Sequence, residues 1–234
     1  MLPALPAFAA PQTGLPKDIN GNDAITITRG IASRKWVAMT FDDGPHPKNT
    51  PQLLDILKAR RIRATFYVIG WRVKAYPDII RRMVAEGHEI GNHTYKHPNL
   101  AGLGQQSLLR EIDSTNDIIY RTTGKMPVTM RPPYGALYQS QRSYVATNRR
   151  MPTILWSVDP ADWRRPGVSV VANRIVGQAH PGAIVLAHDI HWPTIAAMPP
   201  ALDALIKQGY GFTTVSRILG LKDWSKLKFT PRTS

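Results

Sequence analysis

The chain has 234 residues, of which 43% are hydrophobic and 20% are charged, a composition that excludes a disordered protein and suits one folded domain with a sizeable core. Lys and Arg total 30 against 16 Asp and Glu, and the net charge of +14 attracts polyanions such as nucleic acid, anionic cell-wall polymers or lipid headgroups. The absence of cysteine excludes a thiol nucleophile, a Cys-based zinc site and disulfide bonds.

The two ends of the chain differ in composition from its centre. The opening MLPALPAFAAPQ has the small residues that end a signal peptide, but it lacks a basic start and a long apolar stretch. We expect residues 1–30 to form an N-terminal arm, either a signal-peptide remnant or a Pro/Ala-rich segment, and residues 221–234 to form a basic tail. No stretch reaches the roughly 18 apolar residues that a membrane span needs, so we expect no membrane span.

From about Lys35 onward, short runs rich in β-branched and aromatic residues alternate with longer segments of helical period. In chain order, the expected elements are strand Trp36–Phe41, helix Thr50–Arg61, strand Ala64–Gly70, helix Asp78–Gly87, strand His88–His93, helix Gln105–Gly124, strands Val128–Arg131 and Thr153–Asp159, helix Val168–Ala179, strand Ala183–Asp189, helix Thr194–Gly209 and strand Gly211–Val215. This alternation predicts parallel strands joined by helices, in either a barrel or a doubly wound sheet. Both architectures place active sites at the carboxyl ends of the strands.

The carboxyl ends of two early strands carry reactive side chains. Asp42 and Asp43 follow the first strand, and His93 and His97 follow the third. Two histidines four residues apart can face one point from a single helical turn, and a carboxylate from another strand would complete a two-His-one-carboxylate metal site. Neighbouring side chains at a strand end point in different directions, so one acid can bind the metal while the other acts as a base. The alternative for DDGP is a tight turn in which an Asp side chain caps a backbone amide.

Three later segments supply further candidate groups. RPPYG (Arg131–Gly135) forms either a rigid loop whose Tyr134 amide can face an oxyanion or an ordinary loop with a surface arginine. DPADW (Asp159–Trp163) adds two acids and an aromatic ring that packs either on a sugar or in the core. VLAHD (Val185–Asp189) contains a histidine that becomes a candidate general acid if an acidic partner lies beside it.

Taken in this order, the segments TFDDGP, HTYKH, RPPYG, DPADW and LAH resemble the five motifs of the NodB-homology polysaccharide deacetylases, carbohydrate esterase family 4. The motifs run from Thr40 to His188, and the resemblance extends from about Lys35 to Leu219. It implies a single α/β domain over residues 31–220, a distorted (β/α) barrel of seven or eight parallel strands, which agrees with the seven strands expected above.

The resemblance also implies roles for individual residues. Asp42 resembles the catalytic base, Arg131 the residue that orients this base, and the Tyr134 amide the oxyanion donor. Asp162 resembles the residue that holds His188, the general acid. The implied metal ligands are Asp43, His93 and His97, and the implied substrate-binding residues are Trp163, Leu186 and Pro133.

The implied reaction is metal-dependent hydrolysis of N-acetyl groups in N-acetylglucosamine-containing glycans of peptidoglycan or chitin type, with release of acetate. The implied cofactor is one divalent metal, zinc by preference, with Co, Ni, Mn or Fe as alternatives. Competing functions are an O-acetyl-xylan esterase of the same fold, a phosphoesterase with the same Asp/His site, and a non-catalytic module that binds glycan or nucleic acid.

Composition and motifs also bear on partners and location. We expect a monomer that acts on an N-acetylated glycan. We do not expect binding to nucleic acid, because the basic residues are scattered in pairs and no nucleic-acid motif is present. We expect export to the periplasm, the cell wall or the medium, with the cytoplasm as the alternative.

Overall fold

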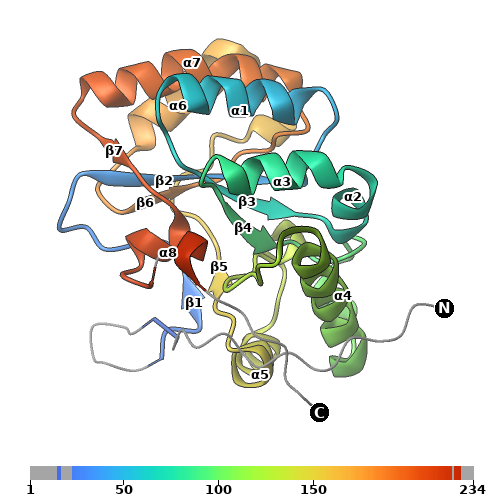
Figure 1. The fold of residues 1–234 in the computed structure, drawn as a ribbon. Coiled ribbons are helices and arrows are strands. Elements are labelled where there is room, and N and C mark those ends of the chain that lie inside the picture. Colours follow the sequence, from blue (N-terminus) through green and yellow to red (C-terminus); the bar gives the residue numbers. More distant parts are fainter. Residues whose placement is uncertain (1–14, 17–22, 223, 228–234) are drawn as a thin grey trace.

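The fold is organised around β2 (Trp36–Asp42), a seven-residue strand that is buried from its second residue to its last. A computed structural model describes residues 15–16, 23–222 and 224–227 of the chain (Figure 1). The elements in chain order are β1 (Thr26–Ile27), β2, α1 (Asn49–Ala59), β3 (Thr65–Val68), α2 (Gly70–Ala75), α3 (Pro77–Ala85), β4 (Glu89–Asn92), η1 (Leu100–Gly102), α4 (Gln105–Thr123), η2 (Pro133–Gly135), α5 (Gln139–Arg149), β5 (Thr153–Ile154), η3 (Asp162–Arg164), α6 (Val168–Gln178), β6 (Ala183–Val185), α7 (Trp192–Lys207), β7 (Gly211–Phe212), α8 (Val215–Ile218) and η4 (Trp224–Lys226).

All pairings between these strands are parallel. The central sheet has the order β4-β3-β2-β6, β7 also pairs with β2, and β1 pairs separately with β5. Isolated parallel bridges join Asn92 of β4 to Met130, Met130 to Thr153 of β5, and Val158 to Val185 of β6. The pairing therefore follows the circuit of a distorted (β/α) barrel, although no continuous ladder closes it within the described ranges.

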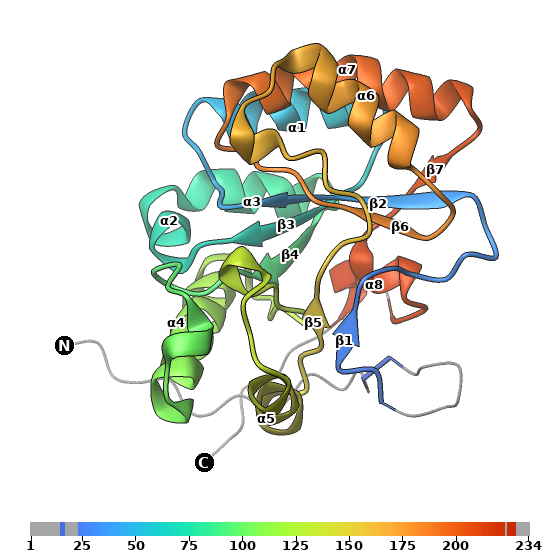
Figure 2. The same ribbon diagram turned by 180° about the vertical axis from the view of Figure 1, so that it is seen from behind.

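The main core lies between β2 and one layer of helices. Helices α1, α6 and α7 lie together on one side of β2 and β6, while α4 and α5 lie on the opposite side of the molecule (Figure 1, Figure 2). Met39 and Phe41 of β2 belong to the same buried cluster as Leu53, Leu54 and Leu57 of α1. Full burial of each such side chain stabilises the fold by roughly 1.5–3 kcal/mol. This packing fixes the position of β2, which ends at Asp42 and is followed directly by Asp43.

One expected strand is not formed as a ladder. The segment Val128–Arg131 contributes only the isolated bridges of Met130. Pro127 and Pro132 flank this segment, and a proline has no N–H to donate to a neighbouring strand. The shortness of the pairing frees the backbone after Met130 to turn into the next loop.

Helices also differ in detail from the expectation. The sequence does not predict α2, α5 or α8, and α5 escapes detection because it is largely polar, with only Val145 and Ala146 buried. The helix α7 begins at Trp192 and continues through Pro199 and Pro200.

The described parts of both chain ends belong to the folded domain. The strand β1, which lies within the predicted N-terminal arm, pairs with β5. Trp224, which lies within the predicted tail, is buried, and its indole N–H donates a hydrogen bond to the carbonyl of Met126 at 2.7 Å. The predicted signal-peptide remnant in MLPALPAFAAPQ lies outside the described residues. Among the described helices, none has the length and apolar character required to cross a bilayer.

Candidate active site

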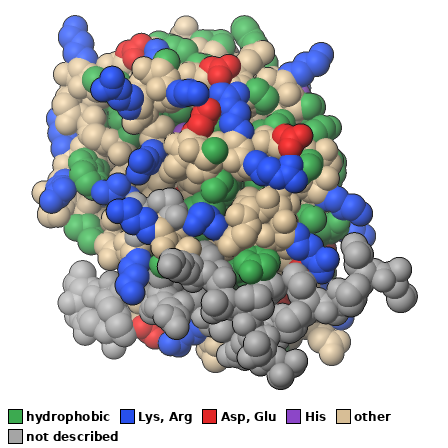
Figure 3. Space-filling view, in the orientation of Figure 1, with side chains coloured by type: hydrophobic (Ala, Val, Ile, Leu, Met, Phe, Trp, Pro, Cys, Tyr) green, Lys and Arg blue, Asp and Glu red, His purple; other side chains and the backbone are tan. Residues whose placement is uncertain are grey.

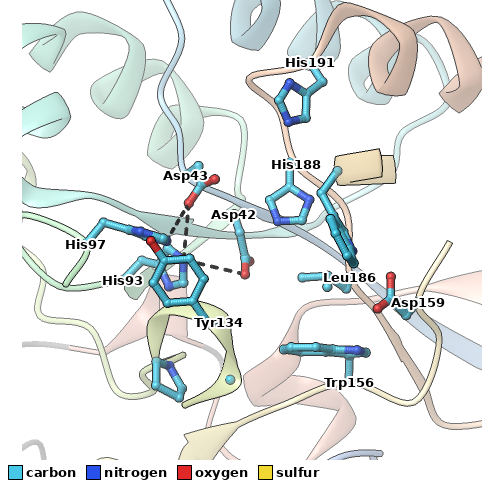
Figure 4. Close-up of a pocket in the computed structure, with 13 residues that line it drawn as sticks. Asp42, Asp43, His93, His97, Tyr134, Trp156, Asp159, Leu186, His188 and His191 are labelled. Carbon is cyan, nitrogen blue, oxygen red and sulfur yellow. Dashed lines mark ion pairs between the residues drawn. The ribbon is translucent and has the colours of Figure 1, made fainter. Parts of the chain in front are cut away.

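A pocket of about 400 Å³ opens at the carboxyl ends of β2 and β4, where the loops that follow these strands meet (Figure 4). Because the strands are parallel, side chains that are distant in sequence arrive at the same edge of the sheet. The residues that line the pocket are Asp42, Asp43, His93, His97, Pro132, Tyr134, Gly135, Trp156, Asp159, Trp163, Leu186, His188 and His191.

Three of these side chains form a cluster that fits a metal ion. Asp43 Oδ1 lies 3.4 Å from His93 Nε2 and 3.2 Å from His97 Nε2, and the three potential ligand atoms lie within 4.8 Å of one another. Asp43 Oδ1 is buried and accepts no hydrogen bond from any described residue. An orphaned carboxylate oxygen that faces two imidazole nitrogens fits a divalent cation, and a donor set of two nitrogens and one oxygen suits zinc and other first-row metals.

Neighbouring groups set the tautomer of His93 and the ionisation of Asp43. His93 Nδ1 lies 2.7 Å from the carbonyl oxygen of Arg131. A carbonyl can only accept, so Nδ1 donates the hydrogen bond and the lone pair of the ring remains on Nε2, which faces Asp43. Burial would raise the pKa of Asp43, but the His93 and His97 rings beside it lower this pKa well below its ordinary value. Asp43 is therefore ionised at neutral pH.

The segment His93–His97 is a loop, so the expectation of a single helical turn is wrong. Thr94 and His97 have φ angles of 66° and 62°, which do not continue a right-handed helix. Side chains from neighbouring elements hold this loop instead: Asn92 Oδ1 accepts a hydrogen bond from the Thr94 amide at 2.8 Å, and Glu111 of α4 accepts two more from successive loop amides. The two imidazoles converge because of these tertiary contacts.

Asp42 lies beside the metal cluster but is held by a different partner. Arg131 is fully buried, and its Nη1 donates to Asp42 Oδ1 at 2.7 Å and to Thr40 Oγ1 at 2.6 Å. Its remaining donors reach the carbonyls of Ile154 at 3.2 Å and Leu155 at 3.0 Å. The second oxygen of Asp42, Oδ2, lies 3.8 Å from His93 Nε2 and faces the pocket (Figure 4). The arginine thus fixes one oxygen of this carboxylate and leaves the other available.

The loop after Arg131 presents a backbone amide. Tyr134 has a φ of 61°, in the left-handed region, while the next two amides donate to the carbonyls of Pro132 and Pro133. The N–H of Tyr134 donates no hydrogen bond to any residue in the part of the chain that the structure describes. The edge of its ring contacts His97, with ring centroids 4.8 Å apart. This loop therefore brings an unused N–H donor to the pocket wall.

His188 lies across the pocket from the metal cluster (Figure 4). Its Nδ1 lies 2.8 Å from Asp162 Oδ1, and its backbone N–H donates to Asp162 Oδ2, also at 2.8 Å. Burial would lower the pKa of His188, but the hydrogen bond and the charge of Asp162, together with Asp42 and Asp43, raise it to about 9. His188 is therefore protonated at neutral pH, with Nδ1 committed to Asp162 and Nε2 free.

The predicted substrate-binding residues lie in different places. Trp163 and Leu186 line the pocket, and Trp163 is 48% exposed, with the guanidinium of Arg164 lying 4.6 Å from the centroid of its ring. The part of the ring that faces the pocket is available to a ligand. Pro133 is buried and does not line the pocket; its neighbour Pro132 does.

The sequence does not single out several residues that belong to the site. Thr194 at the start of α7 donates to Asp162 Oδ2 at 2.8 Å, and Trp156 and His191 line the pocket. Asp159, one of the two acids that the sequence does single out in DPADW, also lines it. The ring of His191 lies 6.1 Å from that of His188, and burial lowers its pKa. The run HDIHWPT, which begins with His188, is the sequence signal that could have found His191 and Thr194.

Comparison with protein-family models matches residues 29–151 to the polysaccharide deacetylases. Over 84% of its length, the chain is 39% identical to the peptidoglycan-N-acetylmuramic acid deacetylase PdaC of Bacillus subtilis, but it spans only 41% of that protein. It is 36% identical to a chitooligosaccharide deacetylase of Sinorhizobium fredii, over 79% of this chain and 92% of that protein.

Two solved structures show the same fold. The Bc1960 peptidoglycan N-acetylglucosamine deacetylase superposes with a TM-score of 0.82 at 32% identity, over 86% of this chain and 95% of that chain. BA3943, a CE4 family pseudoenzyme from Bacillus anthracis, superposes with a TM-score of 0.80 at 31% identity, over 86% of this chain and 70% of that chain. The fold thus occurs both in enzymes and in a pseudoenzyme, so catalysis has to be argued from the side chains of the pocket.

Proposed function

The chain belongs to the polysaccharide deacetylase family, and on that premise we propose that it hydrolyses N-acetyl groups in a glycan of peptidoglycan or chitin type and releases acetate. One observation carries the proposal: the cluster of Asp43, His93 and His97 adjoins the free oxygen of Asp42, and the protonated His188 faces it across the pocket. A metal site, a base and an acid therefore surround one cavity.

Asp43, His93 and His97 would hold one divalent metal, zinc by preference, because imidazole and carboxylate donors suit zinc and it favours low coordination numbers. When bound there, such a metal polarises an amide carbonyl and makes a nearby water more acidic. The hydrogen bond from His93 to the Arg131 carbonyl keeps that ring in the orientation and tautomer that binding requires.

Asp42 is the base in this proposal. The oxygen of the attacking water forms a bond to the amide carbon, and Asp42 Oδ2 takes the proton that the water loses. Arg131 holds the other oxygen, so the carboxylate does not have to reorganise during the reaction. Arg131 also donates hydrogen bonds to Thr40 and to two backbone carbonyls, and these contacts fix the position of the guanidinium that holds Asp42.

The remaining groups act on the tetrahedral intermediate. The Tyr134 N–H donates a hydrogen bond to the oxyanion, a contact worth about 3–4 kcal/mol in the transition state for one well-aimed donor. His188 then gives its Nε2 proton to the amide nitrogen as the carbon–nitrogen bond breaks. The products are acetate and a free amino sugar.

The pocket and the relatives' printed names support the proposed substrate class. The exposed face of Trp163 suits a sugar ring, and the names of the relatives include N-acetylglucosamine, N-acetylmuramic acid and chitooligosaccharide deacetylases. We propose that the enzyme acts outside the cytoplasm, because peptidoglycan and chitin-like polymers are found there. We also propose that it is a monomer. Cell fractionation and light scattering test these two points.

Measurement of acetate released from chitohexaose tests the proposal. Wild type should release acetate, whereas Asp42→Asn should retain the metal, measured by mass spectrometry, and lose turnover about a hundredfold or more. Asp78→Asn, which removes an exposed carboxylate on α3, serves as the control and should behave as wild type. Normal turnover by Asp42→Asn would overturn the assignment of the base. Release from O-acetylated xylan but not from chitohexaose would identify an esterase, and release from neither would identify a non-catalytic relative.

A further inference from the structure

A second cavity of about 400 Å³ opens where β2 begins, at the end of this strand opposite the catalytic pocket. Asp42 lies six residues after Trp36, which corresponds to roughly 20 Å along an extended strand. The two cavities are therefore separate sites. The residues that line the second cavity are Ile31, Ser33, Arg34, Trp36, Arg217, Ile218, Gly220, Leu221 and Lys226.

The charge of this lining has one sign. Arg34, Arg217 and Lys226 contribute three cations, and among the residues that the structure describes no Asp or Glu lines the cavity. Within the described ranges, none of the three forms an ion pair or donates a side-chain hydrogen bond. Glu89, which lies buried beneath α8, is not part of this lining and accepts hydrogen bonds from the amide and the hydroxyl of Ser216. Three unpaired cations around one concavity create a local positive potential.

Further cations lie on the same face of the molecule (Figure 3). In that view Lys and Arg side chains gather over the part of the face where α8 lies, and acidic side chains are sparse there. Elsewhere many cations are paired, such as Arg60 with Asp203 and Arg149 with Asp113. Arg34, Arg217 and Lys226 differ from these paired residues in that no described acid pairs with them.

The cavity also has a rigid, partly apolar wall. The guanidinium of Arg34 lies 5.0 Å from the centroid of the Trp36 ring, a cation–π contact that limits its motion. The indole is in turn confined by Gly211, where an added Cβ would lie 2.7 Å from the ring. Ile218 and Leu221 complete the apolar surface. Such a wall accepts the carbon skeleton of a polyol or sugar, while the cations accept anionic groups.

We propose that this cavity binds a polyanion in which phosphodiesters link polyol or sugar units, and that it does so independently of the catalytic pocket. A single phosphate would fill little of a cavity of about 400 Å³. A chain of phosphodiesters offers repeated charges at intervals and places polyol units against Trp36. A flat lipid surface fits less well, because the cations surround a concavity.

Such binding would keep the enzyme on an anionic polymer while the catalytic pocket, roughly 20 Å away, stays open to the glycan. The inference does not rest on the deacetylase reaction, since a binding measurement and acetate release report on different cavities.

The test is binding of end-labelled poly(glycerol phosphate) by fluorescence anisotropy at about 50 and about 200 mM NaCl. The variant Arg34→Gln/Arg217→Gln/Lys226→Gln removes the three cations. The variant Lys58→Gln/Lys74→Gln/Arg110→Gln removes the same charge from exposed positions of α1, α2 and α4 and serves as the matched control. We expect the cavity variant to bind at least about tenfold more weakly and its salt slope to fall by about 2, and the control to stay within about twofold of wild type.

Equal losses in the two triple variants would assign binding to dispersed charge and would overturn the proposal. Tighter binding of an oligodeoxynucleotide with the same number of phosphates would assign the cavity to nucleic acid, and preferential binding to phosphatidylglycerol vesicles would assign it to lipid; either result overturns the proposal. The cavity variant should release acetate from chitohexaose as wild type does. If the triple variant fails to fold, the single variants Arg34→Gln and Lys226→Gln each remove one exposed cation and should each weaken binding about twofold to threefold.

Discussion

Replacement of Asp162 by Asn should move the pH dependence of turnover, because this carboxylate keeps His188 protonated. Asn can still accept a hydrogen bond from His188 Nδ1, so the variant removes a charge with little change in shape. In the wild type, the pKa of His188 is raised from 6.5 to about 9 despite burial, and Asp162 makes the largest favourable contribution. Without it, burial is opposed only by the charges of Asp42 and Asp43, so the pKa of His188 falls towards its ordinary value.

The size of the effect follows from this shift. A change from 6.5 to about 9 corresponds to roughly 3 kcal/mol. At pH 8, a histidine with a pKa of about 9 is about 90% protonated, whereas one with a pKa of 6.5 is about 3% protonated. Loss of the acid form alone should therefore lower kcat about thirtyfold at pH 8 and far less at pH 6. The proton is present below the pKa and lost above it, so the alkaline limb moves to lower pH.

The assay is the pH profile of kcat for acetate release from chitohexaose, with metal content measured in parallel. A bound divalent cation lowers the pKa of His188 in both proteins, so the displacement between the two profiles, about 2 units, isolates the contribution of Asp162. Thr194→Val removes one hydrogen bond to Asp162 but keeps its charge, and its limb should move by less than about one unit. An unmoved limb in Asp162→Asn, or a loss of kcat that is equal at pH 6 and pH 8, would refute the reasoning.

Three further predictions concern the support of the site. Arg131→Met should lower the free energy of unfolding by about 3–5 kcal/mol in urea titrations, because it leaves the buried Asp42 carboxylate without its partner; a loss below about 1 kcal/mol would contradict this. Gly44→Ala should reduce both the melting temperature and turnover, because its Cβ would overlap the carboxylate of Asp189; wild-type values would show that this contact relaxes freely. Asn92→Leu should weaken metal binding at least about tenfold in competition with a chelating dye, because the His93–His97 loop loses a side-chain anchor; unchanged affinity would show that the loop holds itself.

The sequence predicts the parts of this protein that depend on local pattern. The alternation of apolar runs with helical segments predicts parallel strands, and reactive residues after those strands predict one site at their carboxyl ends. The structure does bring Asp43, His93 and His97 together there. These predictions succeed because burial of a strand and the direction of a parallel sheet are set by the chain's own periodicity.

Features that depend on contacts between distant segments are not predicted. The His93–His97 spacing suggests a helical turn, but Glu111 and Asn92 hold the segment as a loop with positive φ angles. Thr194 contributes through a hydrogen bond to a residue 32 positions earlier. No local period marks such a contact, and the same applies to the choice between the two adjacent prolines, of which Pro132 and not Pro133 lines the pocket.

The central claim is that Asp43, His93 and His97 hold the metal on which deacetylation depends. The most direct test is acetate release from chitohexaose by protein stripped with a chelator and then titrated with zinc, for wild type and for Asp43→Ala. We predict that stripping abolishes release, that about one equivalent of zinc restores it in wild type, and that Asp43→Ala neither retains zinc nor recovers. Full acetate release by the stripped protein, or by Asp43→Ala without bound metal, would contradict the account.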